Sequence, residues 1–73
     1  MEIDINTLRM QSKREEKGMT QKELGIKIGY TEKGAKSAVY KIERGQKRLY
    51  FDTFMKICLI LEEDPVKLIN VYK

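Results

Sequence analysis

The stretch from residue 20 to residue 45 limits the possible folds of this chain more than any other part of it. Thr20 can cap the N-terminus of a helix, and Glu23, three residues later, completes the pattern of a capping box. Gly29 follows where this helix needs a residue that can take a positive φ angle, so the helix is predicted to end there. Another helix ends in the same way at Gly45. The stretch therefore predicts two short helices joined by a tight connection.

The start of the second of these helices can be placed in two ways. Thr31 can cap a long helix, or Gly34 can end a loop so that the helix begins at Ala35 or Lys36. In either case, two capped helices separated by a short break form a candidate helix-turn-helix motif.

The excess positive charge of the chain is confined to this second helix and its flanks. The net charge is +4, and residues 31–48 alone carry six basic and two acidic residues, while the other 55 residues carry nine of each. A confined basic surface is typical of proteins that bind a polyanion, and a basic second helix in this motif points to double-stranded DNA. The basic residues of this segment are Lys33, Lys36, Lys41, Arg44, Lys47 and Arg48.

Three further helices complete the predicted fold, which is all-α, with five short helices in one compact domain over residues 1–73. No segment alternates with period two for long enough to predict a strand. The three helices are predicted from an N-cap at Asp4 or Asn6 to Lys17, from Phe51 or Asp52 to Leu61, and from Pro65 to about Val71. Helical spacing predicts these inward-facing residues: Ile3, Thr7, Met10, Arg14, Leu24, Ile28, Val39, Ile42, Phe54, Ile57, Cys58, Leu61, Val66, Leu68 and Ile69.

The composition argues against an enzyme. The chain has no histidine and one cysteine, Cys58, which lies in an apolar run and is expected to be a buried hydrophobe. The sequence shows no metal-ligand cluster, no glycine-rich phosphate loop after a strand and no nucleophile beside a base. We therefore expect no catalytic residue, metal, cofactor or small-molecule substrate. The apolar runs are too short to cross a bilayer, and the single cysteine suits a reducing, cytoplasmic setting.

Taken in order, these motifs resemble those of the lambda-repressor-like, Xre/Cro-type helix-turn-helix domains. The resemblance covers nearly everything from Leu8 to Ile69. It implies a compact five-helix DNA-binding domain that acts as a dimer to regulate transcription. Its most specific pieces are residues 14–24 (REEKGMTQKEL), 42–45 (IERG), 54–58 (FMKIC) and 64–68.

The resemblance also implies roles for individual residues. Gln21 matches a position that contacts a DNA phosphate at the start of the second helix, where the free backbone N–H groups and the helix dipole favour an anion. Thr20, at the same helix start, is also a predicted phosphate contact. Arg14 matches a residue that pairs with Glu43 and so ties the first helix to the third. The positions that grip the DNA backbone beyond the third helix are matched by Lys47 and Arg48.

The sequence departs from the family pattern in three places. The stretch between Gly29 and Ile42 is longer than the family norm by about four residues. Gly25 stands where the family usually has alanine, which permits very close helix packing but weakens the helix by about 1 kcal/mol. Ile26 occupies a position that is commonly polar, so either the longer turn covers it or it is exposed.

The third helix carries the candidate DNA-reading residues. If Val39 and Ile42 face the core, the residues on the opposite side of this helix are the candidates for contacts to bases. Each of them could instead contact a phosphate or only be solvated. Lys33 and Arg44 are predicted phosphate contacts, and Arg44 alternatively only stabilises the last helical turn through the helix dipole. The predicted base contacts are Lys36, Ser37, Tyr40 and Lys41.

The C-terminal half contains more apolar residues than five short helices obviously bury. They either complete the core or form a self-association face on the fourth and fifth helices; the predicted dimer contacts are Leu59, Ile60, Val71 and Tyr72, with Leu49 and Tyr50 beside them. A dimer can read both halves of a palindromic operator. The sequence thus predicts a dimeric, sequence-specific transcriptional regulator, a repressor. The alternative is a protein-interaction module, such as an antitoxin or accessory factor, that uses the same fold mainly to hold a partner.

Overall fold

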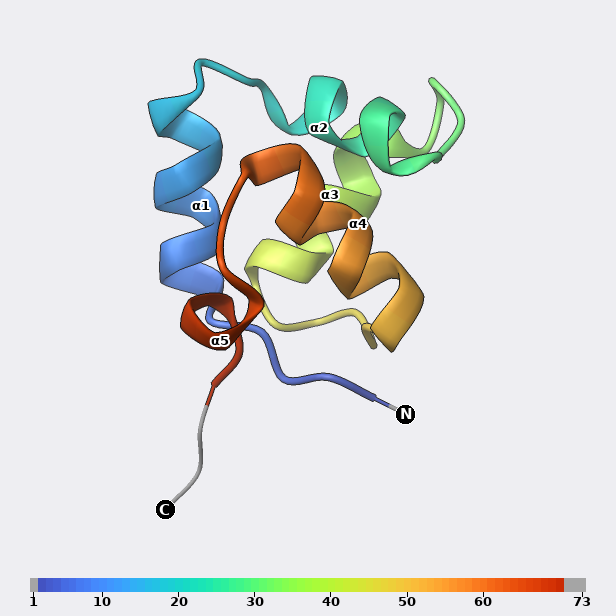
Figure 1. Cartoon of the computed structure of the whole chain (residues 1–73). Helices are drawn as coiled ribbons and strands as arrows, with labels where there is room; N and C mark the ends of the chain where they lie inside the picture. The colour runs from blue at the N-terminus through green and yellow to red at the C-terminus, as the bar shows by residue number, and fades with distance from the viewer. Residues whose placement is uncertain (1, 71–73) are drawn as a thin grey trace.

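The computed structural model describes residues 2–70 and contains five helices packed around one core (Figure 1). The all-α, five-helix prediction is confirmed. Within residues 2–70 the extended backbone forms only two isolated β-bridges, Glu2 with Tyr50 and Ile5 with Ile69. None of the helices in this range is long and apolar enough to cross a membrane. The helices are α1 (Thr7–Glu16), α2 (Gln21–Ile28), α3 (Ala35–Glu43), α4 (Phe51–Leu61) and α5 (Pro65–Leu68).

Side-chain caps set the N-termini of three helices. Of the two predicted caps for α1, Asn6 is the one used, since its Oδ1 accepts a hydrogen bond from Arg9 N at 3.1 Å. The predicted capping box of α2 is present in full, with Thr20 and Glu23 each bonded to the other's backbone N–H. Asp64 caps α5 through Val66 N at 3.0 Å.

The connection between α2 and α3 resolves the two predicted starts of α3. Thr31 does not begin a long helix; it forms a turn, in which its carbonyl oxygen accepts from Ala35 N at 2.8 Å and its Oγ1 accepts from Gly34 N at 3.3 Å. Helix α3 then begins at Ala35. The turn does not cover Ile26 of α2, which has 47% of its surface exposed.

Helices α2 and α3 approach each other very closely at Gly25. A Cβ atom placed on Gly25 would lie 2.5 Å from the carbonyl oxygen of Ala35 and 2.7 Å from its Cβ. Only a residue without a side chain fits there, so Gly25 fixes the distance between α2 and the start of α3. The most deeply buried large side chains are Met10, Leu24, Val39, Ile42, Ile57, Leu61 and Leu68.

The N-terminal residues pack in a way that the sequence did not predict. Ile3 was expected on the inner face of the first helix, but it lies in an extended segment before α1. Its backbone N–H donates to Leu49 O at 2.6 Å, and Asn6 N donates to Leu68 O at 2.7 Å. Ile3 and Ile5 are both buried, and they close one end of the core. Leu49, expected among the surplus apolar residues, is also buried, at 3% exposure.

Helix α5 is shorter than predicted. It ends at Leu68 because Ile69 takes an extended conformation, with φ −83° and ψ 141°, and the chain then pairs with the N-terminal segment through Asn70 N and Asp4 O at 2.9 Å. Leu68 is buried and Ile69 is half-buried, as expected of inward residues, but Val66 is 73% exposed and does not face the core. The predicted helix end at Val71 lies outside the described residues.

Candidate nucleic-acid interface

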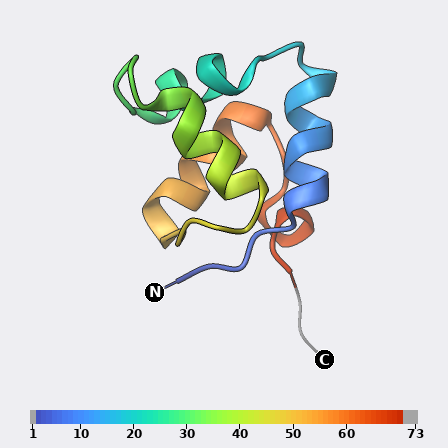
Figure 2. The same cartoon turned by 180° about the vertical axis from the view of Figure 1, so that it is seen from behind.

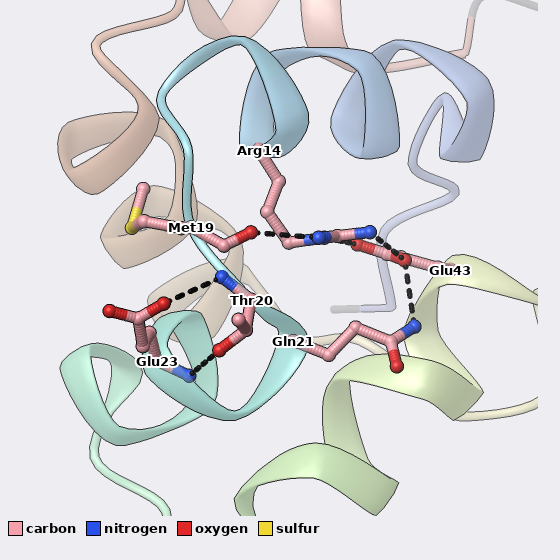
Figure 3. Close-up of polar contacts among 6 residues, drawn as sticks. All are labelled: Arg14, Met19, Thr20, Gln21, Glu23 and Glu43. Carbon is pink, nitrogen blue, oxygen red and sulfur yellow. Dashed lines mark hydrogen bonds and ion pairs between the residues drawn. The ribbon is translucent and has the colours of Figure 1, made fainter.

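Three helices meet at a polar network built on Arg14 and Glu43 (Figure 3). The Arg14 Nε atom lies 2.6 Å from Glu43 Oε2, and Nη2 lies 3.3 Å from Oε1. Arg14 Nη1 also donates to the carbonyl oxygen of Met19 at 2.8 Å, and Gln21 Nε2 donates to Glu43 Oε1 at 3.1 Å. The structure thus contains the Arg14–Glu43 ion pair that the resemblance implied, and it adds Gln21 to the pair.

This network places the start of α2 against the end of α3. Both charged side chains are nearly buried, with 10% of Arg14 and 4% of Glu43 exposed. A buried bidentate pair has a narrow range of acceptable geometries, so it holds α1 and α3 at a defined crossing. Gln21, bonded to the same carboxylate, is thereby held at the edge of α3.

The N-terminus of α2 presents unpaired backbone donors next to Gln21. The first N–H groups of a helix have no intrahelical partner, and they favour an anion. Thr20 is the N-cap, and Glu23 bonds its backbone N–H; this bond, together with the one from the Thr20 side chain, lowers the pKa of Glu23 below its ordinary range. In Figure 3 the Glu23 carboxylate lies on the other side of the helix start from Gln21. The Glu23 carboxylate is thus turned away from Gln21, and the carboxylate that Gln21 does contact, Glu43, is paired with Arg14.

The outward side of α3 continues this surface. Figure 2 shows α3, in green to yellow, crossing the face turned to the viewer. Lys36 lines a hollow of about 510 Å³ together with Thr20 and Gln21, and Arg14 and Lys22 complete its wall. The predicted base-contacting residues Lys36, Ser37, Tyr40 and Lys41 are all exposed.

A second, smaller hollow lies beside the first. It is lined by Tyr40 and Arg44 of α3, by Gln21 and Glu43, and by Gln11 of α1. The Arg44 guanidinium carbon lies 5.6 Å from the centroid of the Tyr40 ring, within the range of a cation–π contact. This contact lays the guanidinium across the exposed side of α3.

The flanking basic residues do not all gather on this surface. Lys47 lies over the ring of Tyr30, 5.7 Å from its centroid, and it lines a hollow beside the N-terminal segment rather than beside α2. Burial raises the pKa of Tyr30, so its hydroxyl stays neutral. Lys33 and Arg48 are exposed on the loops before and after α3. Of the predicted DNA contacts, those that line the two adjoining hollows are Thr20, Gln21, Lys36, Tyr40 and Arg44.

Two residues on this surface were not predicted from the sequence. Lys22 lines the larger hollow and also forms an exposed ion pair with Glu32 at 3.1 Å. Gln11 lines the smaller one. The available signal for Gln11 was its place one turn before Arg14 in the predicted first helix. Within residues 2–70, no group of three or more acidic, cysteine or histidine side chains is arranged to hold a metal ion.

Comparison with known proteins agrees with this geometry. Residues 10–68 match a family model described as helix-turn-helix. The chain belongs to the lambda-repressor-like, Xre-type helix-turn-helix family. This is a family of DNA-binding domains, and the helix-turn-helix of this member is formed by α2 and α3. Searches of curated proteins and of solved structures found no match to the chain.

All three places where the sequence departs from the family pattern, the turn after Gly29, Gly25 and Ile26, lie inside the matched range. In this chain Gly25 allows the close approach of α2 to Ala35. The extended segment at residues 2–6 lies before the matched range.

Proposed function

We propose that this Xre-type protein is a sequence-specific regulator of transcription that inserts α3 into the major groove of double-stranded DNA. One observation carries the proposal: the excess positive charge of the chain lies on and around the exposed side of α3, directly beside the anion-favouring start of α2. A groove-reading helix needs such a neighbour, because phosphate contacts set its register on the duplex.

The proposed DNA contacts divide into residues that contact bases and residues that contact phosphates. Lysine can donate to guanine O6 and N7, serine can donate or accept, and tyrosine can pack on a thymine methyl. We assign base contacts to Lys36, Ser37, Tyr40 and Lys41 on this basis. The proposed phosphate contacts are Thr20, Gln21, Lys33, Arg44, Lys47 and Arg48, and Lys47 would reach a phosphate from its place over Tyr30.

We further propose that the protein forms a homodimer, which binds a palindromic operator and represses transcription by occupying it. Helix α4 supports the dimer, because Phe51, Met55 and Leu59 follow one another at intervals of four residues along one stripe. Phe51 is 56% and Leu59 74% exposed, and Met55 is half-buried. Of the predicted dimer contacts, Ile60 is half-buried against the core, and Val71 and Tyr72 lie outside the described residues.

The spacing of this α4 stripe is self-complementary. If two copies pack with their α4 helices antiparallel about a two-fold axis at Met55, each Phe51 meets the partner's Leu59 and the two Met55 side chains meet each other. A two-fold interface requires this property, since the same patch must fit itself. Asp52 and Lys56 flank the stripe on one side and carry opposite charges, so they can pair across the axis.

The test is binding to duplexes selected from a random pool. We expect the protein to bind a selected duplex more tightly than a scrambled one of the same composition. We also expect log affinity to fall linearly with log salt, with a slope of about −0.9 for each phosphate neutralised. Absence of binding at low salt would refute the proposal.

The exposed α4 stripe also supports a second candidate, a module that binds a different protein, such as an antitoxin or an accessory factor. Size-exclusion chromatography with light scattering separates the two candidates. A stable dimer of the chain alone supports the regulator, and a monomer that becomes soluble or compact only with a partner supports the interaction module.

A further inference from the structure

We infer that the hollow between α1 and α3 binds one phosphate of the DNA backbone, and that Gln11 of α1 is one of its ligands. The inference rests on the proposed function. It adds helix α1 to the DNA-binding surface, together with Gln11, to which neither the family pattern nor the sequence gives a role. The hollow is lined by Gln11, Gln21, Tyr40, Glu43 and Arg44.

The chemistry of the hollow suits an anion. The amide of Gln11 is half-buried and has no hydrogen-bond partner within residues 2–70, although an amide carries two donors. Gln21 uses one amide hydrogen on Glu43, which leaves its second hydrogen available. Arg44 and Tyr40 line the same hollow, and a guanidinium and a phenol hydroxyl can both donate to an anion.

Glu43, the acidic residue that lines the hollow, does not prevent an anion from binding there. Glu43 accepts from Arg14 at 2.6 and 3.3 Å and from Gln21 at 3.1 Å, so its charge is compensated and its oxygens are engaged. The hollow has a volume of about 160 Å³. That is several times the volume of about 30 Å³ that a water molecule takes up in the liquid, so the oxygens of a phosphate group can enter it.

The position of the hollow favours a phosphate of DNA over a free ion. It adjoins the hollow beside the start of α2, with Gln21 common to both walls. With α3 in the major groove, Gln21 and Gln11 would meet the same strand on the side of α1. Contacts of this kind position a protein without reading sequence, so Gln11 is expected to act equally on all duplexes.

The experiment compares three variants of the full chain on the selected and the scrambled duplex. Gln11→Ala should weaken binding to both duplexes by the same factor, about ten- to hundredfold, as expected for one hydrogen bond to a charged group. Because glutamine is neutral, its salt slope should not change. Gln11→Lys should bind more tightly and steepen the slope by about 0.9. Ser12→Ala, an exposed neighbour on α1 outside the hollow, is the matched control and should bind like the wild type.

Replacing single phosphates of the selected duplex by uncharged methylphosphonates then locates the contact. One position should weaken the wild type but not weaken Gln11→Ala further. If the wild type binds DNA while Gln11→Ala and Gln11→Lys both match Ser12→Ala, the inference is wrong and the proposed function stands. If the wild type does not bind, the proposed function itself fails. Binding of inorganic phosphate at Gln11 with no effect of the variants on DNA affinity would assign the hollow to free anions and overturn the inference.

Discussion

The contact at Gly25 makes an unusual prediction for a helical glycine, because Gly25→Ala should destabilise the protein. At an ordinary helix position this change stabilises by about 1 kcal/mol. Here the new Cβ would lie 2.5 Å from the Ala35 carbonyl oxygen, and a comfortable contact needs at least 3.4 Å. Helices α2 and α3 would have to part by roughly 1 Å, and overpacking of this kind costs about 1–3 kcal/mol, occasionally more.

The atoms around Gly25 cannot move easily to make room for the new Cβ. The atom closest to the new Cβ belongs to the backbone of Ala35 and cannot rotate away, so we place the overpacking cost at the upper end of the range. After the helix-propensity gain, a net loss of about 2 kcal/mol remains. For a domain of this size, such a loss lowers the melting temperature by roughly 8–16 °C.

Thermal unfolding followed by circular dichroism measures this loss. Ser12→Ala, at an exposed position inside α1, is the control and should leave the melting temperature unchanged or slightly raised. A rise in the melting temperature of Gly25→Ala, of the size usual for glycine to alanine in a helix, would show that α2 and α3 are not in contact there.

Three other changes have predictable effects. Arg14→Ala should cost about 3–5 kcal/mol in urea unfolding, because it leaves the Glu43 carboxylate buried without its ion-pair partner; a loss below about 1 kcal/mol would contradict this. Arg9 lies 2.5 Å from Glu63 and lowers the pKa of that carboxyl below its ordinary value of 4.5. Since the pKa is lower in the folded state, the pair stabilises the fold above pH 4.5 and its contribution is lost as pH falls through the folded value. Glu63→Gln should therefore flatten the acid limb of melting temperature against pH, and an unchanged limb would refute the role of the pair. Leu59→Lys in the α4 stripe should convert the proposed dimer to a monomer in light scattering, whereas Val66→Lys, equally exposed on α5, should not.

The starts of α2 and α5, and that of α1 to within two residues, could be predicted because their causes are local. The N-caps Asn6, Thr20 and Asp64 act on backbone groups within three residues of themselves, so the sequence alone contains the whole interaction. The end of α5 has a distant cause. The Leu68 carbonyl, which a longer helix would have used internally, accepts instead from Asn6 N, more than sixty residues earlier in the chain.

The N-terminal segment has the sequence pattern of an extended strand, but the pattern is too short to predict one. Ile3 and Ile5 alternate with polar residues, the pattern of a half-buried extended segment, but five residues do not separate that pattern from the approach to a helix cap. Packing decides the outcome, since Ile3 pairs with Leu49 and both become part of the core.

The sequence predicts which helix carries the DNA-reading residues, but it does not predict which residues of the other helices lie beside it. The outward side of α3 follows from the burial of Val39 and Ile42, which the helical spacing predicted. Which residues of other helices lie beside that side depends on how the helices cross. For this reason the sequence does not single out Gln11, and it does not predict that Lys47 lies over Tyr30.

The affinity of Lys41→Ala for DNA shows whether α3 reads bases. Lys41 is exposed on α3, and lysine can donate to guanine in the major groove. We predict that Lys41→Ala loses about 1–3 kcal/mol on a selected duplex and much less on a scrambled duplex at the same salt concentration. An equal loss on both duplexes would show that Lys41 only holds the backbone. No loss on either duplex would contradict the placement of α3 in the groove.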